Sequence, residues 1–495
     1  MVNPRVCFVI PPSPFLSDER VFMSLGVLKV ASAIEAAYPV DVLDLSGVAN
    51  FGDVVEEYFR LKQTSMVGIT VTTPQLPAAV AIIKTIRQAT PTARIILGGP
   101  HITLVYAAFT REQDKGISGR ATTTFRDLEE LADVLVAGDG EKSIFEALGP
   151  NPPKVINADD PDSSMFLRNN DLNEMPWPAR HLIDVSSYHY SIDGERALSI
   201  VSQLGCPFGC GFCGGRYSPS LRRMRSRSKE SVLAEMEHLY AKYGVKGFMF
   251  YDDELNVNHS LFTDLLAGVI ELQNRLGVEF RLRGFVKSQL FNEEQAHLMY
   301  KAGFRWLLTG FESASPEILA NMNKRATVEE NSRCMEIAKA SGLKVKALMS
   351  LGHPGESQAT AEMTRDWLLQ VKPDDFDISL ITVYPGTPYY DDAIAHPQLE
   401  HVWVYTYNEA NLYSREIDYR TVSDYYKGDP DIGYESYVYT DYLQPGEIVK
   451  LRNNIDREVR HQLNIPYPTS TPATRYEHSM GQIGLSDSIL RSTPE

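Results

Sequence analysis

Three cysteines in one short stretch are the residues of this sequence with the clearest chemistry. Cys206, Cys210 and Cys213 are spaced as Cys-x3-Cys-x2-Cys. Three thiolates on one loop can bind three corners of an iron–sulfur cubane, which normally takes four cysteines. The fourth iron then has no protein ligand and can bind a substrate or a cofactor. Glycines and a proline between the cysteines let the loop wrap closely around such a cluster.

A zinc site is the alternative for these cysteines, and the sequence disfavours it. Tetrahedral zinc needs a fourth ligand, and no further Cys or His lies close by in the sequence. Cys7 and Cys334 lie in an apolar strand pattern and in a helical pattern, so we expect both to be buried core thiols. No second cysteine cluster exists that could bind an auxiliary iron–sulfur centre.

The composition limits the cellular compartment and the kinds of partner that we expect for this protein. The chain has 495 residues and a net charge of −16, which argues against a nucleic-acid partner because such a surface needs a basic footprint. The few cysteines argue against a disulfide framework and fit a reducing compartment. Residues 6–10 are too short an apolar run for a signal peptide, and no run reaches the roughly 18 apolar residues of a membrane span. We therefore expect a cytoplasmic protein without a membrane or nucleic-acid partner.

The elements that precede the cysteines form an α/β unit. Residues 1–150 alternate continuous apolar strands, such as 66–71, with helical patterns, such as 75–89. This alternation predicts a parallel sheet covered on both faces, as in a flavodoxin-like (Rossmann-type) domain. Polar and glycine-rich turns follow the strands at their carboxyl ends, where ligands bind in such sheets.

The cysteines lie near the start of a second α/β unit, residues 196–395. Six strand–helix units follow one another there, and each has its unusual residues directly after the strand. This layout predicts a partial (β/α)6 barrel of the TIM type, with its site on the carboxyl-terminal rim. Residues 151–195 have the Pro-rich and Asp-rich chemistry of a linker.

The last part of the chain changes character. Residues 396–465 are rich in tyrosine and end in a helical pattern, so we expect a small α-rich domain. Its tyrosines either close the barrel and face the substrate or pack as a satellite domain. Residues 466–495 are rich in Ser, Thr and Pro, the composition of a disordered tail.

The triplet follows the first barrel strand and has Phe212 before its last cysteine, and in this it resembles the radical S-adenosylmethionine enzymes. Residues 1–395 as a whole look like the cobalamin-binding branch of that superfamily, which places a cobalamin domain before the barrel. The resemblance rests on the order and spacing of short motifs: Ser24-Leu25-Gly26, Gly98-Gly99-Pro100-His101, Gly138-Asp139-Gly140-Glu141, Gly205-Cys206-Pro207, Asp252-Asp253, Gly310-Phe311-Glu312-Ser313 and Tyr384-Pro385-Gly386-Thr387-Pro388.

The resemblance implies a [4Fe-4S] cluster on the three cysteines, S-adenosylmethionine chelated to the open iron, and cobalamin. It implies a methyltransferase that moves a methyl group from S-adenosylmethionine through methylcobalamin to an unactivated carbon of a small molecule, in natural-product biosynthesis. It also implies an external electron donor such as flavodoxin or ferredoxin. Cyclisation, rearrangement or oxidation without methyl transfer is the alternative outcome of the same cofactors.

The resemblance also implies residues for S-adenosylmethionine. These are Phe212, Asp252, Asp253, Arg283, Glu312, Ser313, Gly352 and Pro354. The two aspartates suit the methionine ammonium, although they could instead cap the following helix. Arg283 ends a predicted strand and suits the methionine carboxylate, with a surface salt bridge as the alternative.

Cobalamin contacts are expected after the strands of the first unit. The residues are Ser24, Leu25, Gly26, Thr70, Thr72, Thr73, Gln75, Gly98, Gly99, Pro100, Gly138, Gly140 and Glu141. The glycines would let the backbone approach the corrin or its nucleotide tail. The Asp-x-His-x-x-Gly motif, whose histidine binds cobalt in classical methyltransferases, is absent from the sequence. We therefore expect no histidine from that motif below the cobalt, and a structural role for His101.

Overall fold

The first sheet is parallel throughout, and its strands follow the order β2-β1-β3-β4-β5-β6. The computed structural model describes residues 3–429 and 433–466. The strands are β1 Val6–Ile10, β2 Val40–Asp44, β3 Met66–Thr70, β4 Arg94–Gly98, β5 Val134–Gly138 and β6 Val155–Ala158. The helices are α1 Leu25–Ile34, α2 Phe51–Lys62, α3 Leu76–Ala89, α4 Pro100–Asp114, α5 Arg120–Leu131 and α6 Gly140–Ala147.

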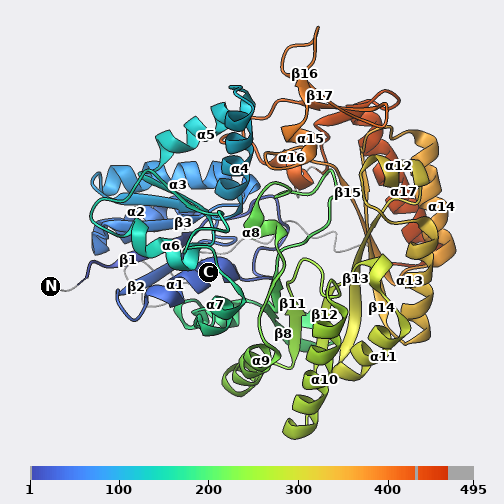
Figure 1. Ribbon diagram of the computed structural model, residues 1–495, viewed down its shortest axis with the longest axis horizontal. Helices are drawn as coiled ribbons and strands as arrows, with labels where there is room; N and C mark the ends of the chain where they lie inside the picture. The colour runs from blue at the N-terminus through green and yellow to red at the C-terminus, as the bar shows by residue number, and fades with distance from the viewer. Residues whose placement is uncertain (1–2, 430–432, 467–495) are drawn as a thin grey trace, which may run out of the picture.

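Both faces of this sheet are covered by helices (Figure 1). Helix α1 packs against α6, and α2 packs against α3. The strands are apolar along nearly their whole length because helices bury them from both sides, and every residue of β1 is buried. This confirms the flavodoxin-like fold. Strand β6 completes the sheet although it lies in residues 151–195, which we predicted to be a linker.

The second sheet follows the order β15-β14-β13-β12-β11-β8-β7. Its strands are β7 Ser191–Ile192, β8 Glu195–Ile200, β11 Gly247–Phe250, β12 Arg281–Phe285, β13 Phe304–Glu312, β14 Lys344–Leu351 and β15 Asp375–Leu380. All pairs are parallel except the short β7 with β8. The covering helices are α9 Lys229–Tyr243, α10 His259–Leu276, α11 Glu293–Ala302, α13 Val328–Ala340 and α14 Gln358–Val371. The six parallel strands form the expected partial barrel, which is open on one side (Figure 1).

The C-terminal region contains a sheet as well as helices. Its antiparallel strands are β16 Ile394–Ala395, β17 Val402–Tyr407, β18 Ala410–Arg415 and β19 Val438–Thr440, and its helices are α16 Asp424–Lys427 and α17 Pro445–Leu463. The expectation of an α-rich region missed this sheet. The signal was the alternation of aromatic residues along residues 402–407, which has the period of two of a strand.

Helix α17 covers the last barrel strand. It packs against β15 and α14, and Arg460 donates a hydrogen bond of 2.7 Å to the carbonyl oxygen of Phe376. Strand β15 is therefore not left as a bare edge, which would be a site for unwanted strand pairing. The region thus closes one side of the barrel instead of standing apart as a satellite.

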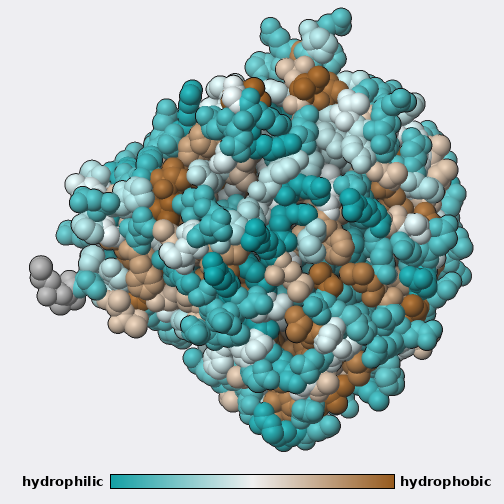
Figure 2. All heavy atoms as spheres, viewed as in Figure 1, coloured by the Kyte–Doolittle hydropathy of each residue, from teal (hydrophilic) through white to brown (hydrophobic). Residues whose placement is uncertain are grey.

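The remaining helices and strands are short. They are β9 Gln203–Leu204, β10 Arg225–Ser226, α7 Asn169–Glu174, α8 Pro219–Arg222, α12 Pro316–Asn321 and α15 Pro388–Asp391, with 3-10 turns at Thr73–Gln75, Arg180–Leu182, Val185–Ser187 and Ser288–Leu290. Figure 2 shows mainly hydrophilic residues on one face of the molecule, with hydrophobic residues in small separate groups. Within residues 3–429 and 433–466, no helix is long and apolar enough to cross a membrane. Apart from Pro466, the predicted tail lies outside the described residues.

Candidate cofactor site

The cysteine loop, residues 205–213, follows β8 and β9 at the carboxyl ends of the barrel strands. Its first residue is Gly205, with φ of +86°, where a Cβ would collide with the carbonyl oxygen of Arg223. Only glycine fits that position without strain. The amide of Cys206 donates to Leu221 O at 3.0 Å, and the amide of Gly211 donates to Met322 O at 2.7 Å. Neighbouring segments therefore hold the loop at both ends.

The three thiols lie close enough together to influence one another electrostatically. Desolvation raises the pKa of Cys206 to about 11. Desolvation and the neighbouring Cys210 and Cys206 raise the pKa of Cys213 to about 12, although one side of Cys213 is accessible to solvent. Nearby positive charge is needed to keep such thiols ionised, and the irons of a cluster supply it.

A single metal ion does not fit this arrangement. In the described part of the chain, no three His, Cys, Asp or Glu side chains converge as ligands of one ion. A mononuclear zinc site would require that convergence, because each Zn–S bond is only about 2.3 Å long. A cubane does not require it, since each cysteine binds a different iron. The donor set therefore fits a cluster with one open iron.

The paired aspartates after β11 differ in what they contact. Asp252 is buried, and its carboxylate accepts hydrogen bonds from Ser202 N (3.1 Å), Ser202 Oγ (2.6 Å) and Gln203 N (2.5 Å). Asp252 thus holds the turn that leads into the cysteine loop, and burial raises its pKa to about 6. Asp253 is exposed, and within the described residues its carboxylate accepts a single hydrogen bond, from Gly205 N at 3.1 Å. Asp253 is the carboxylate of the pair that remains available to a ligand.

Two lysines and a glutamate near the loop were not found by sequence reasoning. Lys287 is 4% exposed, and its Nζ lies 4.1 Å from the ring centroid of Phe208. Burial lowers its pKa, and the neighbouring Lys324 lowers it further. Among the described residues, the Lys287 ammonium has no ion pair. Lysine directly after a barrel strand was the signal that could have found it.

Glu254 is an acidic side chain near the loop, opposite in charge to Lys287. Its Oε2 is buried and has no hydrogen-bond partner within the described residues. Burial raises its pKa to about 7, against the attraction of Lys324 and Lys287. Unpaired buried charges are costly in a folded protein. Lys287 and Glu254 therefore have the character of groups that await a charged ligand, here one that carries both signs.

Arg283 lies inside its strand and not at the strand's end. It is the third residue of the five-residue strand β12, opposite Met249 and Trp306. Its Nη1 donates a hydrogen bond of 2.8 Å to the hydroxyl of Tyr190, and its guanidinium lies 5.8 Å from the Trp306 ring centroid. The prediction that Arg283 ends the strand and meets a carboxylate was wrong about its place. The strand continues to Phe285, and Lys287 is the cation beyond its end.

Glu312 stands at the end of β13 in a conformation that is unusual for its residue type. Its φ is +66°, and the pairing with β14 shifts register there. Such backbone strain persists in sites where function or packing demands it. One carboxylate oxygen pairs with Lys324 Nζ at 3.2 Å, and the other accepts a bond of 2.8 Å from Ser350 Oγ. The side chain is thereby held in one orientation beside the cysteine loop.

A chain of buried hydrogen bonds continues from Glu312. The single hydroxyl proton of Ser350 goes to Glu312, so His353 Nε2 must donate to Ser350 Oγ, at 2.8 Å. His353 Nδ1 then carries no proton and accepts from the hydroxyl of Tyr389, at 3.0 Å. Desolvation, then Lys324, lowers the pKa of His353 to about 3, so the ring is neutral. All donors in the chain point toward the Glu312 carboxylate.

The remaining predicted residues for S-adenosylmethionine shape the same rim. Phe212 packs edge-on against His353, with ring centroids 5.3 Å apart. Ser313 is buried, and its Oγ accepts from Ser315 N at 3.1 Å. Pro354, two residues after Gly352, has a carbonyl oxygen that accepts from Asn321 at 2.9 Å. Ser313 and Pro354 therefore show structural contacts, while Phe212 lies directly on the cysteine loop.

The carboxyl-end rim of the first sheet brings together most of the residues predicted for cobalamin. Thr70, Gly98 and Gly138 end β3, β4 and β5. Gly99 has φ of +98°, and a Cβ there would lie 2.8 Å from Thr70 Oγ1. That close approach joins the ends of β3 and β4 and requires glycine.

Other predicted cobalamin residues have partners within the first unit. Gln75 is buried and donates to Pro11 O and Ser13 Oγ, both at 2.9 Å. Thr72 donates to Gln75 Oε1 at 2.9 Å. Glu141 pairs with Lys29 at 3.4 Å. Ser24, Leu25, Gly26, Pro100 and Gly140 lie at the first turns of α1, α4 and α6.

His101 is wholly buried in this rim. Its Nδ1 lies 3.0 Å from Thr73 Oγ1, and Nε2 has no partner in the part of the chain that the structure describes. Burial lowers its pKa to about 3. Its ring lies 6.3 Å from that of Tyr419, which belongs to the C-terminal region. The neutral, enclosed ring agrees with a structural role.

Tyrosines of the C-terminal half lie close to both rims. Tyr384 would lie 3.4 Å from a Cβ at Gly214, directly after the cysteine loop. The ring of Tyr426 lies 5.4 Å from that of Phe15, which follows β1. Both tyrosines are only partly buried. Aromatic side chains therefore line the region where the two rims approach each other.

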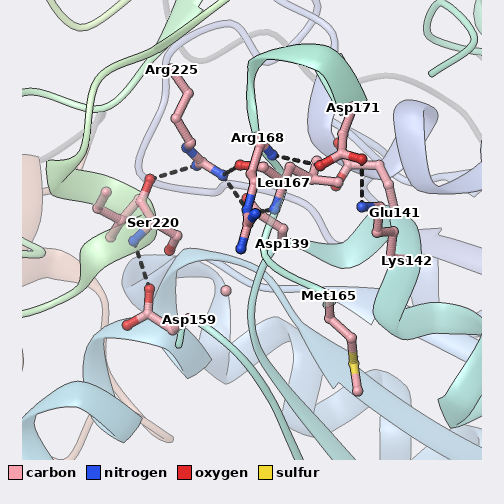
Figure 3. A network of polar contacts seen from close by, with 12 residues as sticks. Asp139, Glu141, Lys142, Asp159, Met165, Leu167, Arg168, Asp171, Ser220 and Arg225 are labelled. Atoms are coloured by element: carbon pink, nitrogen blue, oxygen red, sulfur yellow. Dashed lines mark hydrogen bonds and ion pairs between the residues drawn. The ribbon is translucent and has the colours of Figure 1, made fainter. Parts of the chain in front are cut away.

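An ion pair joins the two rims directly. Asp139 follows β5 and pairs with Arg225, which follows the cysteine loop and lies in β10 (Figure 3). Both side chains are nearly inaccessible to solvent. Desolvation raises the pKa of Asp139 to about 6, and Arg225 opposes that rise.

Two known protein families match the two units of the chain that carry these rims. The B12 binding domain family matches residues 18–129, and the radical SAM superfamily matches residues 200–368. The chain belongs to the cobalamin-dependent radical SAM enzymes. Its cofactors are a [4Fe-4S] cluster, S-adenosylmethionine and cobalamin.

Individual relatives cover most of the chain. An uncharacterized methyltransferase, PH0819, of Pyrococcus horikoshii is 27% identical over 402 residues, 79% of this chain and 83% of the relative. The anaerobic magnesium-protoporphyrin IX monomethyl ester cyclase of Rubrivivax gelatinosus is 25% identical over 72% of this chain and 64% of its own. The solved structure of the radical S-adenosylmethionine methyltransferase TsrM from Kitasatospora setae, with tryptophan and a SAM analogue bound, has a TM-score of 0.64 at 19% identity, covering 96% of this chain and 93% of that one. The fold is therefore shared.

Proposed function

We propose that this enzyme is a methyltransferase that moves a methyl group from S-adenosylmethionine, by way of cobalamin, to an unactivated carbon of a small molecule. The observation that carries the proposal is the joining of a three-cysteine loop to the carboxyl-end rim of a second parallel sheet within one molecule. Each rim is a ligand-binding edge of its fold. The methyltransferases among the relatives support methyl transfer.

The chain's own residues would hold the cofactors. Cys206, Cys210 and Cys213 would bind the cluster, and the rim of the first sheet around Gly98 and Gly138 would bind cobalamin. When bound, the cluster supplies an electron that splits S-adenosylmethionine into methionine and a 5′-deoxyadenosyl radical, while cobalamin carries the methyl group. The protein's part is to position these groups and to keep water away from them.

The charges near the loop suit the methionine end of S-adenosylmethionine. Asp253 and Glu254 would accept hydrogen bonds from its ammonium, and Lys287 would pair with its carboxylate. Glu312, fixed by Lys324 and Ser350, would bind its ribose hydroxyls or ammonium. These assignments replace Asp252 and Arg283, whose side chains are engaged elsewhere.

The test uses S-adenosylmethionine with a labelled methyl group. The protein is reconstituted without oxygen with iron, sulfide and cobalamin, and is reduced by flavodoxin or ferredoxin as the external donor. We expect label on cobalamin and, when a substrate is present, label in the product, together with 5′-deoxyadenosine. Absence of label from cobalamin would contradict the methyltransferase proposal.

One variant tests cluster binding independently of the overall fold. Cys213→Ala removes one of three thiolates and should abolish cluster binding and 5′-deoxyadenosine formation, while cobalamin binding remains. Turnover by that variant would contradict the cluster assignment.

Cyclisation or oxidation without methyl transfer is the second candidate, and the cyclase from Rubrivivax gelatinosus favours it. The same experiment distinguishes the two reactions. A product without label, formed together with 5′-deoxyadenosine, would decide for cyclisation or oxidation.

A further inference from the structure

One short segment links the cysteine loop to the rim of the first sheet. This junction segment, residues 218–226, contains α8 and β10. On its barrel side, β10 pairs with β9 directly before the loop. The amide of Cys206 donates to Leu221 O at 3.0 Å, and Arg222 Nη2 donates to Pro207 O at 2.6 Å. The loop must therefore move with the segment.

The other side of the junction segment is bound to the first sheet. Asp159, the residue after β6, is 6% exposed and accepts bonds of 2.8 Å from Ser218 Oγ and from Ser220 N. Asp139, after β5, pairs with Arg225 and accepts from Leu167 N at 2.8 Å (Figure 3). Two neighbouring strand ends thus hold one segment at two points.

Arg225 is suited to this place by its shape. Nη1 contacts both Asp139 and Leu167 O (2.9 Å), while Nη2 donates to Ser220 O at 2.7 Å. Its guanidinium also lies 4.6 Å from the Phe166 ring centroid. A planar fork serves several acceptors in fixed directions, whereas a lysine ammonium carries the charge on one atom. These contacts attract the junction segment to the first sheet and also fix its orientation relative to that sheet.

Stability alone does not account for a buried ion pair here. Buried pairs give little net stability compared with apolar residues of similar volume, because desolvation offsets the attraction. The best-attested role of such buried polar groups is to fix the register between the parts that they join. The parts joined here are the cluster loop and the rim predicted for cobalamin, which has Gly138 and Gly140 on either side of Asp139.

We propose that the contacts of Arg225 with Asp139, and of Asp159 with Ser218 and Ser220, set the distance and orientation between the cluster and the cobalamin. Arg225 and Asp159 are positioning residues for the transfer of the methyl group from S-adenosylmethionine, bound at the cluster, to cobalamin, and the assignment rests on the proposed function. A misplacement of about 1 Å can reduce the rate of an aligned reaction roughly 100-fold. The rate that a rigid connection between the rims preserves can therefore offset the free-energy cost of burying these charges.

The test measures the distance between the cofactors in Arg225→Lys and Asp159→Asn. Both cob(II)alamin and the reduced cluster are paramagnetic, so pulsed dipolar EPR reports the cobalt–cluster distance distribution in the reconstituted enzyme. We expect a shifted or broadened distribution in both variants, with iron, sulfide and cobalamin contents at the wild-type level. An unchanged distribution overturns the proposal. Loss of the cluster in both variants also overturns it, in favour of a role in folding the loop.

Lys142→Met is the matched control. It removes the ion pair of 2.5 Å with Asp171, which belongs to the same network but makes no hydrogen bond with the junction segment (Figure 3). We expect the wild-type distance distribution in this variant. A change as large as that of Arg225→Lys would overturn the proposal, because any lesion nearby would then act alike.

A second measurement does not need cobalamin. In protein loaded with the cluster alone, amide hydrogen exchange in residues 205–213 should be faster in Arg225→Lys than in the wild type and unchanged in Lys142→Met. Equal exchange in all three proteins overturns the proposal. Failure of the wild type to take up cobalamin would instead contradict the proposed function, so the two failures are distinguishable.

Discussion

Replacing Lys287 by methionine separates its effect on folding from its effect on ligand binding. The side chain is 4% exposed, its ammonium lies 4.1 Å from the ring centroid of Phe208, and it forms no ion pair within the described chain. Methionine fills a similar space without a charge. Because an unpaired buried charge opposes folding, we expect Lys287→Met to unfold at the wild-type temperature or above it, measured without S-adenosylmethionine.

The effect on binding should have the opposite sign. A hydrogen bond to a charged partner contributes about 1.5–3 kcal/mol, and each factor of ten in affinity corresponds to about 1.4 kcal/mol. The Kd for S-adenosylmethionine should therefore rise roughly 10- to 150-fold in Lys287→Met. Equilibrium dialysis of the cluster-loaded protein under anaerobic conditions measures it.

A ligand without the carboxylate completes the experiment. Decarboxylated S-adenosylmethionine should bind the wild type as weakly as S-adenosylmethionine binds Lys287→Met, and the variant should not distinguish the two ligands. Lys301→Met, an exposed lysine of α11, is the control and should bind as the wild type does. If Lys287→Met still prefers the ligand that carries the carboxylate, Lys287 is not its partner.

The affinity for S-adenosylmethionine should also depend on pH. Burial lowers the pKa of Lys287, so its ammonium loses its proton at a lower pH than an ordinary lysine does. Affinity of the wild type for S-adenosylmethionine should fall as the pH rises through that lowered pKa. In Lys287→Met this fall should be absent; a fall of equal size would assign it to another group.

Three further predictions concern the same rim. Tyr389→Phe leaves His353 Nδ1 buried without its donor, which should destabilise the protein by about 1–3 kcal/mol in thermal or denaturant unfolding; an unchanged stability would contradict the direction assigned to that hydrogen-bond chain. The folded-state pKa of Glu254 is raised to about 7 from 4.5, so its contribution to stability is most favourable below pH 4.5 and is lost as the pH rises through 7. Glu254→Gln should therefore raise the unfolding temperature of the cofactor-free protein at pH 8 and have little effect at pH 5, and equal effects at both would refute this. Gly205→Ala should lose iron on reconstitution, because a Cβ there meets the Arg223 carbonyl in a conformation that costs about 1–3 kcal/mol; full iron content would show that the loop tolerates the shift.

The two parallel sheets were predictable because largely apolar strands alternate with helical patterns along the chain, although strands such as β12 and β15 carry charged residues at alternate positions. Periodicity was less informative where an element is short or lies at an edge. Strand β6 has four residues and lies in Pro-rich surroundings, so local composition indicated a linker, yet pairing with β5 makes it part of the first sheet. Strands β17 and β18 were hidden by the abundance of tyrosine, although the aromatic residues of β17 alternate as a strand requires.

In the candidate site, too, some residues were predictable from the sequence and others were not. Cys206, Cys210 and Cys213 are adjacent in sequence, so their shared chemistry was visible without a structure. Lys287 and Glu254 come from separate strand ends. Within the described residues Glu254 Oε2 has no hydrogen-bond partner and the Lys287 ammonium has no ion pair, a property of packing that no local pattern contains. Arg283 shows the converse, since a suitable residue type near a strand end proved to be inside the strand.

By itself, the sequence determined the kind of chemistry, because three cysteines that can bind a cluster with one open iron lie within eight consecutive residues. It also determined the two folds, through apolar strands alternating with helices. Only the tertiary structure decided how the two units are joined. Asp139 and Arg225 lie 86 positions apart, and attraction between such residues exists only once folding brings them together and removes water from both.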